Sequence, residues 1–379
     1  MRDHCALLVY DFRASGVVRN LLRIAAAARE AGLDIELWPI RAQGELLGQV
    51  PPGVRVRPIL AGRSRASREL DSLRAIPALA RAIDRRRPRL LFSSGNHSHL
   101  HAALALLFVG ERSRVRFVGR ASNAVVSKGV GLARWRRLAG PLERFQYRSM
   151  DRIVAVSAEL ACALADDLGI DAGRIVTIPN GVDVAAIEAA AAAPAAHRFF
   201  AEGAPPIILG IGRLSRQKNF EGLVRAFARL RAARPARLIV LGAGGARRLR
   251  RLKALAKRLG VGDDVDFAGF VPNPAAILAR ASLFVLSSRW EGASNVILEA
   301  LACGCPVVAT RVPTGVAEVL GAGGIAPLVP AGDDRALAEA MSGRLDRPRA
   351  SPALRARARA YDLSRTLAHY VDLLRCGSR

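Results

Sequence analysis

The chain of 379 residues has little of three things: long apolar runs, cysteine and acidic residues. No segment reaches the roughly 18 uninterrupted apolar residues that a membrane-spanning helix needs. The N-terminal stretch MRDHCALLVYDF has an apolar core of five residues that ends at Asp11. This core is too short for a signal peptide and predicts a buried first strand. We therefore expect a cytoplasmic protein.

Cysteine is scarce and scattered, which argues against a disulfide framework. Two of the cysteines flank a single glycine, but no further Cys or His lies at the spacing of a zinc site. No pair of aspartates forms the D-x-D metal signature. We expect reduced packing cysteines and no bound metal. The five cysteines are Cys5, Cys162, Cys303, Cys305 and Cys376.

The shortage of acidic residues leaves a large positive charge. The chain has 58 Lys and Arg against 32 Asp and Glu, a formal net charge of +26. Such a surplus is compatible with nucleic acid, an anionic membrane surface or a small acidic substrate as partner. It is equally compatible with a compositional bias toward Ala and Arg, so charge alone does not decide.

The length is about twice that of a usual domain, which favours two domains. Short apolar, β-rich runs alternate with helical stretches throughout, a pattern typical of parallel sheets covered on both faces. Thirteen strands are too many for one such sheet, so we predict two doubly wound α/β domains. The predicted strands are 5–10, 34–40, 54–59, 89–94, 115–120, 152–157, 174–179, 206–212, 237–242, 265–269, 283–288, 306–310 and 325–329.

The domain boundary is predicted from an alanine-rich stretch that ends in two prolines. We place the N-terminal domain at 1–184, a helix and linker at 185–204, and the C-terminal domain at 205–360. The remaining residues, 361–379, contain an amphipathic helix that can pack back on the N-terminal domain. In doubly wound sheets ligands bind beyond the carboxyl ends of the strands, so site residues are expected there, facing an interdomain cleft.

The stretch GRLSRQKNF follows one such strand end and carries Arg213 and Lys218, with Asn219 at the start of a helix. A planar guanidinium and a point-like ammonium suit a diphosphate. The alternative is that they are two ordinary members of a large basic set.

The stretch EGASNVILEA follows another strand. Gly292 permits a tight turn, and Ser294 is a plausible N-cap for a helix that starts near Asn295, whose free N–H groups form an anion site. If the stretch is helical, Glu291 and Glu299 lie about 12 Å apart along the axis and about 80° apart around it. They can then hold hydroxyls at the two ends of a nucleotide sugar, although a surface position is the commoner fate of a glutamate.

Two glycine-rich turns give weaker signals. Ser15-Gly16 lies after the first strand, where backbone can approach a phosphate, but one glycine is less than a full dinucleotide-binding fingerprint. The GAGG stretch at 242–245 is explained equally well as a strand-to-helix turn.

Together, GRLSRQKN, LGAGG, FAGFVPNP, LSSRWEGASNVILEALACGCPVVAT and IPNGVD resemble the motifs of family-4 retaining glycosyltransferases of the GT-B fold. The motifs cover about residues 174–335, and SGVVR at 15–19 matches more loosely. The resemblance implies two Rossmann-like domains, a nucleotide-diphosphate sugar as donor, no bound cofactor or metal, and transfer with retention at the anomeric carbon.

The resemblance also implies roles for individual residues. Glu291 and Glu299 match the E-x₇-E pair, with Glu291 on the donor sugar and Glu299 on the ribose. Arg213 and Lys218 match the diphosphate pair, and these two with Glu291 are the expected catalytic groups. Gly16 matches a loop that approaches the donor. The remaining donor contacts are expected from Gly292, Ala293, Ser294 and Asn295.

A sugar-side residue is harder to assign. Several relatives carry a histidine after the strand predicted at 115–120, whereas this chain reads RASNAV there. His97, Arg120 and Asn123 remain open candidates, and a helix-cap or surface role is an equal alternative for the histidines of SGNHSHLH.

The segment 131–150 alternates apolar and basic residues, and Pro141 is predicted to split it into two short helices. Such a segment suits an anionic membrane surface. The alternative is an ordinary core-facing helix with a solvated arginine face. The alternating residues are Leu132, Trp135, Leu142 and Phe145 with Arg134, Arg136, Arg137, Arg144 and Arg148.

The sequence thus predicts a retaining glycosyltransferase that extends a lipid-linked cell-surface glycan, such as a lipopolysaccharide or exopolysaccharide, as a peripheral protein on the inner face of the cytoplasmic membrane. Other chemistry on the same fold, a sugar phosphorylase or nucleotide-sugar epimerase, is the alternative. Nucleic-acid binding is less supported, because no zinc module, helix-turn-helix pattern or interleaved aromatics accompany the charge.

Overall fold

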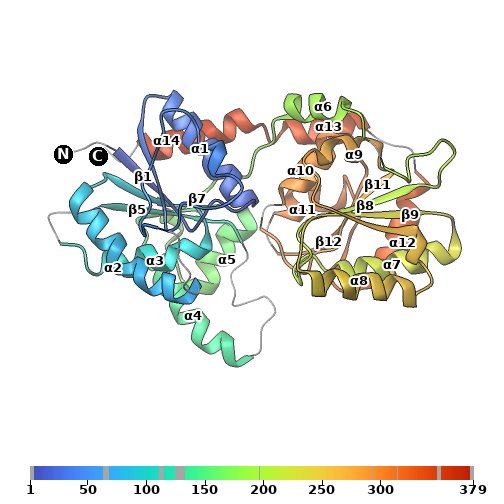
Figure 1. The fold of residues 1–379 in the computed structure, drawn as a ribbon, viewed down its shortest axis with the longest axis horizontal. Coiled ribbons are helices and arrows are strands. Elements are labelled where there is room, and N and C mark those ends of the chain that lie inside the picture. Colours follow the sequence, from blue (N-terminus) through green and yellow to red (C-terminus); the bar gives the residue numbers. More distant parts are fainter. Residues whose placement is uncertain are drawn as a thin grey trace. The chain divides into compact units, whose positions relative to one another are not determined.

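The fold is taken from a computed structural model, which describes residues 4–62, 68–110, 115–123, 133–195, 197–292, 294–313, 315–347 and 351–375. The chain divides into two compact units (Figure 1). Unit 1 comprises residues 1–179 and 364–379, and unit 2 comprises residues 180–363.

Unit 1 contains a parallel sheet of seven strands in the order β3-β2-β1-β4-β5-β6-β7. The strands are β1 His4–Val9, β2 Asp34–Pro39, β3 Arg55–Val56, β4 Leu90–Ser93, β5 Arg116–Ala121, β6 Arg152–Ala155 and β7 Ile175–Thr177. Its helices are α1 Gly16–Glu30, α2 Arg68–Arg86, α3 Asn96–Leu106, α4 Ala133–Arg148, α5 Ala158–Leu168 and, from the C-terminus, α14 Leu363–Arg375.

Unit 2 contains a parallel sheet of six strands in the order β10-β9-β8-β11-β12-β13. The strands are β8 Ile207–Ile211, β9 Arg237–Leu241, β10 Val265–Gly269, β11 Leu283–Leu286, β12 Val307–Arg311 and β13 Leu328–Pro330. The helices are α6 Val184–Ala192, α7 Phe220–Ala233, α8 Ala246–Arg258, α9 Pro274–Arg280, α10 Asn295–Ala302, α11 Val316–Val319, α12 Asp334–Leu345 and α13 Ser351–Arg359.

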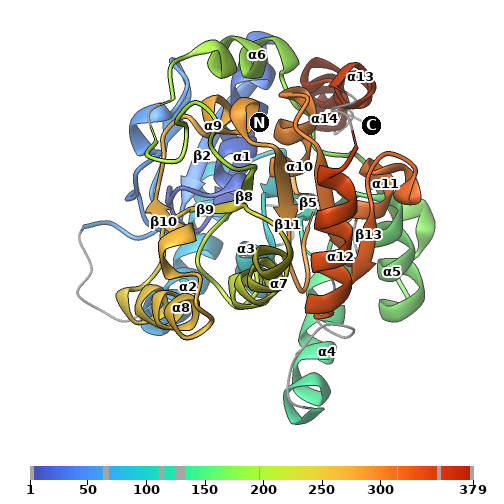
Figure 2. The ribbon, with the colours of Figure 1, turned by 90° about the vertical axis from the view of Figure 1, so that its right-hand side faces the viewer.

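Each sheet is covered on both faces, which explains why its strands read as unbroken apolar runs. In unit 2, one core forms where α9 and α10 pack on the sheet, around Phe284 and Leu301. A second core forms on the other face, where α7, α8 and α12 pack around Phe227 and Leu238 (Figure 2). The strand order of unit 2 corresponds to the first six positions of the unit 1 order, and β7 is an additional strand at one edge of unit 1. The prediction of two doubly wound sheets is confirmed.

The chain crosses between the units near residues 179 and 363. Helix α6 lies in the stretch 185–204 that the sequence predicts as a helix and linker, and it packs against α9 and α10 in unit 2. The reason is that partly buried apolar residues of α6, such as Ile187, contact the unit 2 core. At the other end, Tyr370 and Leu374 of α14 are buried in the core of unit 1.

Helix α4 continues through Pro141, so the prediction of two short helices was wrong. A proline removes only one intrahelical N–H donor, and neighbouring packing can hold the helix together across it. Here Glu143, Gln146 and Tyr147 are buried just after the proline and anchor the second half of the helix.

Two smaller expectations concern cysteine and membranes. Cys5, Cys303 and Cys305 are buried and free, as packing cysteines should be, but Cys162 is exposed on α5 and Cys376 lies outside the described residues. Within the described ranges, no helix is both long and apolar enough to cross a membrane.

Candidate functional site

The order of the unit 2 sheet reverses direction between β8 and β11, which are direct neighbours. In doubly wound sheets, the carboxyl ends of the strands at this switch point form the usual ligand site. Two loops leave the sheet there, residues 212–219 after β8 and residues 287–294 after β11. Both contain residues that the sequence singled out.

An ion pair joins the two loops. The Lys218 ammonium lies 2.6 Å from Glu291 Oε1, and the two side chains are 16% and 7% exposed. The Ser288 hydroxyl donates to the same carboxylate oxygen at 2.5 Å. A mostly buried carboxylate that receives both an ammonium and a hydroxyl is fixed in one position.

The backbones of the loops are also tied together. Ser287 Oγ donates to the carbonyl oxygen of Lys218 at 2.8 Å, and the Arg289 N–H donates to the carbonyl of Gln217 at 2.8 Å. Asn219 has a left-handed backbone with φ of 50° as the N-cap of α7, and its side-chain oxygen accepts from Arg289 Nε at 3.3 Å. These contacts hold the backbone of Lys218 in place and so fix the position from which its side chain extends.

Glycine is required where the loops after β8 and β9 cross. Gly242 has a φ of +139°, and a Cβ built on it would lie 1.9 Å from the backbone oxygen of Gly212. Gly212 has a φ of +152°, and a Cβ there would lie 2.7 Å from Lys218 Cε. A larger residue at position 212 would therefore displace the stem of Lys218. A larger residue at position 242 would displace the Gly212 backbone, which gives the first glycine of the GAGG turn a structural role.

The start of α10 carries an unpaired hydroxyl. Ser294 is the N-cap, as predicted, but its side chain makes no capping bond. Within the described residues, both Ser294 Oγ and Ser215 Oγ of the facing loop are buried without a hydrogen-bond partner. Buried polar atoms are nearly always paired, so the orphaned hydroxyl of Ser294 at the N-terminus of α10 indicates a place for a polar ligand.

The other predicted donor residues occupy the same region. Arg213 is exposed, and in the described part of the chain it has no hydrogen bond or ion pair. Gly292 is buried, and Glu299 is half-buried on α10. Ala293 lies outside the described residues. The helical spacing expected between Glu291 and Glu299 was wrong, because α10 begins only at Asn295.

Sequence reasoning missed several residues here. Asn180 Nδ2 donates to Asn295 Oδ1 at 2.5 Å, which links the start of unit 2 to the first turn of α10. Ser215, Ser287 and Ser288 were also missed. Serine and asparagine are common in loops, so only the presence of Asn180 in the IPNGVD motif offered a signal.

In unit 1, Gly16 is the first residue of α1 and is exposed. Ser15 is the N-cap, and its hydroxyl accepts from the Val18 N–H at 3.3 Å. The preceding N–H of Ala14 donates to the Glu45 carboxylate at 2.9 Å. Hydrogen bonds from the backbone N–H groups of Glu45 itself and then of Ala14 hold the pKa of Glu45 below its usual value.

The sugar-side candidates differ in their surroundings. Arg120 is buried, and its Nε donates to the Tyr370 hydroxyl of α14 at 2.9 Å, a contact that stabilises the core of unit 1. Asn123 Oδ1 is buried and lacks a hydrogen-bond partner in the part of unit 1 that is described. His97 lies in α3, and its side chain lies outside what the structure describes.

His99, next to His97 in the same motif, belongs to the core of unit 1. It is fully buried, with Nδ1 at 2.8 Å from Ser93 Oγ and Nε2 at 3.1 Å from the Arg120 carbonyl oxygen. Both ring nitrogens are therefore paired. This histidine has a structural position and no surface role.

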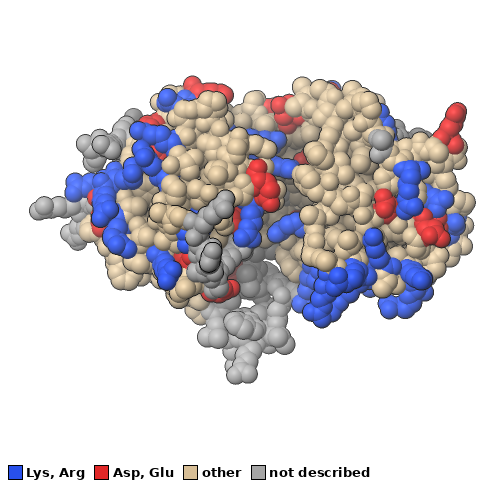
Figure 3. Space-filling view, viewed as in Figure 1, with Lys and Arg blue, Asp and Glu red and all other residues tan. Residues whose placement is uncertain are grey.

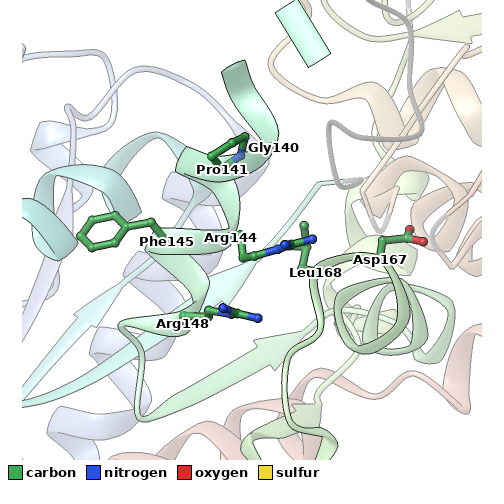
Figure 4. Close-up of a pocket in the computed structure, with 7 residues that line it drawn as sticks. All are labelled: Gly140, Pro141, Arg144, Phe145, Arg148, Asp167 and Leu168. Atoms are coloured by element: carbon green, nitrogen blue, oxygen red, sulfur yellow. The ribbon is translucent and has the colours of Figure 1, made fainter. Parts of the chain in front are cut away.

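A separate cavity of about 510 Å³ lies in unit 1 between α4 and α5. Arg144 and Arg148 extend from α4 toward the end of α5 (Figure 4). The cavity belongs to the second half of the basic segment 131–150, in which Leu142 is 51% exposed. Of that segment, residues 131–132 and the side chains of 133–139, including Trp135, lie outside the described part. The lining residues are Gly140, Pro141, Arg144, Phe145, Arg148, Asp167 and Leu168.

Comparison with known proteins adds two family matches. Residues 14–186 match the model described as Glycosyltransferase Family 4. Residues 205–347 match the model described as Glycosyl transferases group 1. Together they include both loops of the site in unit 2 and the start of α1 in unit 1.

Two individual relatives are also named as glycosyltransferases. The N-acetylgalactosamine-N,N'-diacetylbacillosaminyl-diphospho-undecaprenol 4-alpha-N-acetylgalactosaminyltransferase of Campylobacter jejuni is 34% identical over 159 residues, 41% of this chain and 42% of that enzyme. D-inositol 3-phosphate glycosyltransferase 2 of Catenulispora acidiphila is 29% identical over 363 residues, 88% of this chain and 83% of that enzyme. The chain thus aligns with less than half of the first relative and with most of the second.

A solved structure shows the same fold. HepE from Anabaena, in complex with UDP and glucose, has a TM-score of 0.76 at 19% identity, over 98% of this chain and 99% of that chain. With the two family matches and the two doubly wound sheets, this likeness leads to one assignment: the chain belongs to the group 1 and family 4 glycosyltransferases of the GT-B fold.

Proposed function

We propose that this glycosyltransferase moves a sugar, with retention, from a nucleotide-diphosphate sugar to a lipid-linked glycan. The observation that carries the donor half of the proposal is the ion pair of Lys218 and Glu291, which joins the two loops that also contain the orphaned hydroxyls of Ser215 and Ser294. The related structure of HepE was solved with UDP and glucose, which supports a nucleotide sugar as donor.

The diphosphate would bind where positive charge converges. Arg213 is an exposed cation without a partner in the described residues, and α10 presents its N-terminus at the same switch point. Lys218 has three N–H donors, so it can keep its bond to Glu291 and still donate to a phosphate oxygen. As the glycosidic bond breaks, charge grows on the leaving diphosphate, and fixed cations and N–H dipoles stabilise it most at that moment.

The two glutamates would hold the ends of the donor. Glu291 has a second carboxylate oxygen besides the one that Lys218 and Ser288 contact, and we place a hydroxyl of the donor sugar there. Glu299, four residues into α10, would bind the ribose. No metal is required in this scheme, because Arg213, Lys218 and the helix dipole supply the positive charge.

The lipid-linked acceptor in this proposal is supported by other observations. The Campylobacter relative is named for an undecaprenol-diphosphate acceptor, a lipid-linked glycan. The net charge of +26 suits an anionic membrane surface, where each Lys or Arg contributes about 1 kcal/mol. We therefore place the protein at the inner face of the cytoplasmic membrane as a peripheral enzyme, with the basic segment 131–150 as one contact.

The decisive experiment replaces Lys218 with alanine. Loss of one preorganised cation at the leaving group should lower kcat by about 10²–10³. Lys257→Ala, an exposed lysine on α8, is the matched control and should retain full activity in a detergent-solubilised assay. Circular dichroism verifies that both variants fold, and NMR of the product reports the anomeric configuration.

The substrate for this assay comes from a screen of UDP-, GDP- and ADP-linked sugars by thermal shift. A ligand at a hundredfold excess over its Kd stabilises the protein by about 2.7 kcal/mol. Undiminished turnover in the Lys218→Ala protein contradicts the donor assignment, and an inverted product contradicts retention.

A further inference from the structure

Helix α8 of unit 2 carries an unusually basic face. Of its 13 residues, seven are Lys or Arg and none is acidic. Arg248 pairs with Glu221 of α7 at 3.2 Å. The other six cations are exposed and have no hydrogen bond or ion pair with any described residue. They are Arg247, Arg250, Arg251, Lys253, Lys257 and Arg258.

These six side chains form one continuous surface. At 100° per residue they occupy about 160° of the helix circumference, and from residue 247 to 258 they extend over about 17 Å. Figure 3 shows the resulting field of Lys and Arg over α8. Six unpaired cations so close together repel one another, and an anionic partner relieves that repulsion.

The opposite side of α8 is already used for folding. Leu252 and Ala256 are almost fully buried, and Leu255 is 9% exposed, all in the core that α8 shares with α7. An interfacial amphipathic helix inserts its apolar face between lipids, but α8 cannot do so without leaving this core. Any partner must therefore be held by charge at the outer face alone.

We propose that the α8 face docks unit 2 onto an anionic lipid surface through electrostatic contacts with lipid phosphates, without insertion. A membrane matches a row of cations that lies along one convex helix face, because clusters of four to eight Lys or Arg on a helix are typical of anionic lipid binding. This surface is distinct from the segment 131–150 in unit 1, and it involves no residue of the donor site.

Nucleic acid fits the face less well. Between the six cations α8 exposes only alanines, and no aromatic, amide or hydroxyl side chain is present on the helix to stack on or hydrogen-bond a base. Such a face can meet phosphates but offers nothing for the bases, which leaves the lipid surface as the better match.

The test is co-sedimentation of the full-length protein with phosphatidylcholine vesicles that contain phosphatidylglycerol, against pure phosphatidylcholine. Each cation near an anionic leaflet contributes roughly fivefold in affinity, so the triple variant R250Q/K253Q/K257Q should bind about 100-fold more weakly. Binding of the unaltered protein should fall steeply with salt, since exposed charges are screened.

Three further proteins complete the test. R335Q/R347Q/R359Q removes the same charge from exposed positions on unit 2 outside α8 and should bind like the unaltered protein. The swap R250K/K253R/K257R keeps the charge and should also bind normally. Lys218→Ala should bind normally too, because the proposal does not depend on the donor site.

Equal vesicle binding by the α8 triple variant and its control overturns the proposal. Vesicle binding that persists at high salt also overturns it, because it indicates insertion into the membrane. A third contradicting result is a protein that does not bind anionic vesicles but binds RNA or DNA fragments through the same α8 residues.

Discussion

Replacing Lys218 with methionine should destabilise the ligand-free protein as well as disable it. The change removes the ammonium and leaves the Glu291 carboxylate, 7% exposed, without its cationic partner. Breaking a buried ion pair on one side costs about 3–5 kcal/mol. Lys218 is 16% exposed, so water can partly compensate, and we expect the lower end, about 3 kcal/mol.

The partner change, Glu291→Gln, leaves the lysine unpaired at a position that retains some access to water. We expect a cost of about 2 kcal/mol, because the amide can still accept from Ser288. The double variant K218M/E291Q contains no uncompensated charge and should cost about 3 kcal/mol in total. The coupling energy between the two residues is then about 2 kcal/mol.

Urea unfolding of the four proteins, followed by tryptophan fluorescence, measures this coupling, and Trp290 lies next to Glu291 in the chain. Arg225 and Asp334, also in unit 2, form a matched control pair at 2.5 Å with 41% and 18% exposed side chains. Their coupling should stay below about 1 kcal/mol, as for other exposed pairs. Additive effects at Lys218 and Glu291 would refute the idea that burial makes this pair strong.

Two further predictions follow from the same structure. Gly242→Ala should destabilise unit 2 by at least about 2 kcal/mol and weaken donor binding, because its Cβ meets the Gly212 backbone oxygen at 1.9 Å. Gly245→Ala, with nothing within 4 Å of its Cβ, should cost less than about 1 kcal/mol in the same urea and thermal-shift assays, the effect of replacing the glycine N-cap of α8. Burial raises the pKa of both Tyr147 and Tyr370, so above pH of about 10 the unfolded chain loses phenol protons that the native state keeps. Stability should then fall as pH rises, and unfolding curves between neutral and alkaline pH should show a smaller loss for Tyr370→Phe.

The strands could be predicted from the sequence because burial on both faces leaves a simple signature. A parallel strand such as β11 is apolar at every position, and turns bound it on each side. Helix α4 could not be predicted in the same way. Proline is locally unfavourable in a helix, and only the burial of Tyr147 and its neighbours shows why α4 continues past Pro141.

In the candidate site, too, the sequence predicted some features and could not predict others. Loop motifs identified Lys218 and Glu291 separately, but they are 73 residues apart, and their contact depends on the adjacency of β8 and β11. Strand order is a property of the folded sheet, and the local pattern does not encode it. For the same reason the hydroxyls of Ser215 and Ser288 carried no signal until the two loops were placed side by side.

Docking through α8 should leave the donor site unchanged. The helix follows the Gly242–Gly245 turn, which contacts the loop of Lys218, so a shift of α8 could reach the site. However, Leu252 and Ala256 hold α8 in the core of unit 2, and lipid phosphates would contact only its outer face. A ligand shifts a conformational equilibrium only if it binds two states with different affinity, and a rigidly packed helix has only one state.

Calorimetry should therefore give the same affinity for UDP, within about twofold, with and without phosphatidylglycerol vesicles. A genuine allosteric coupling would change this affinity fivefold or more. A larger difference would mean that α8 and the glycine turn form a two-state element, in which case K253Q, outside the site, should abolish that difference.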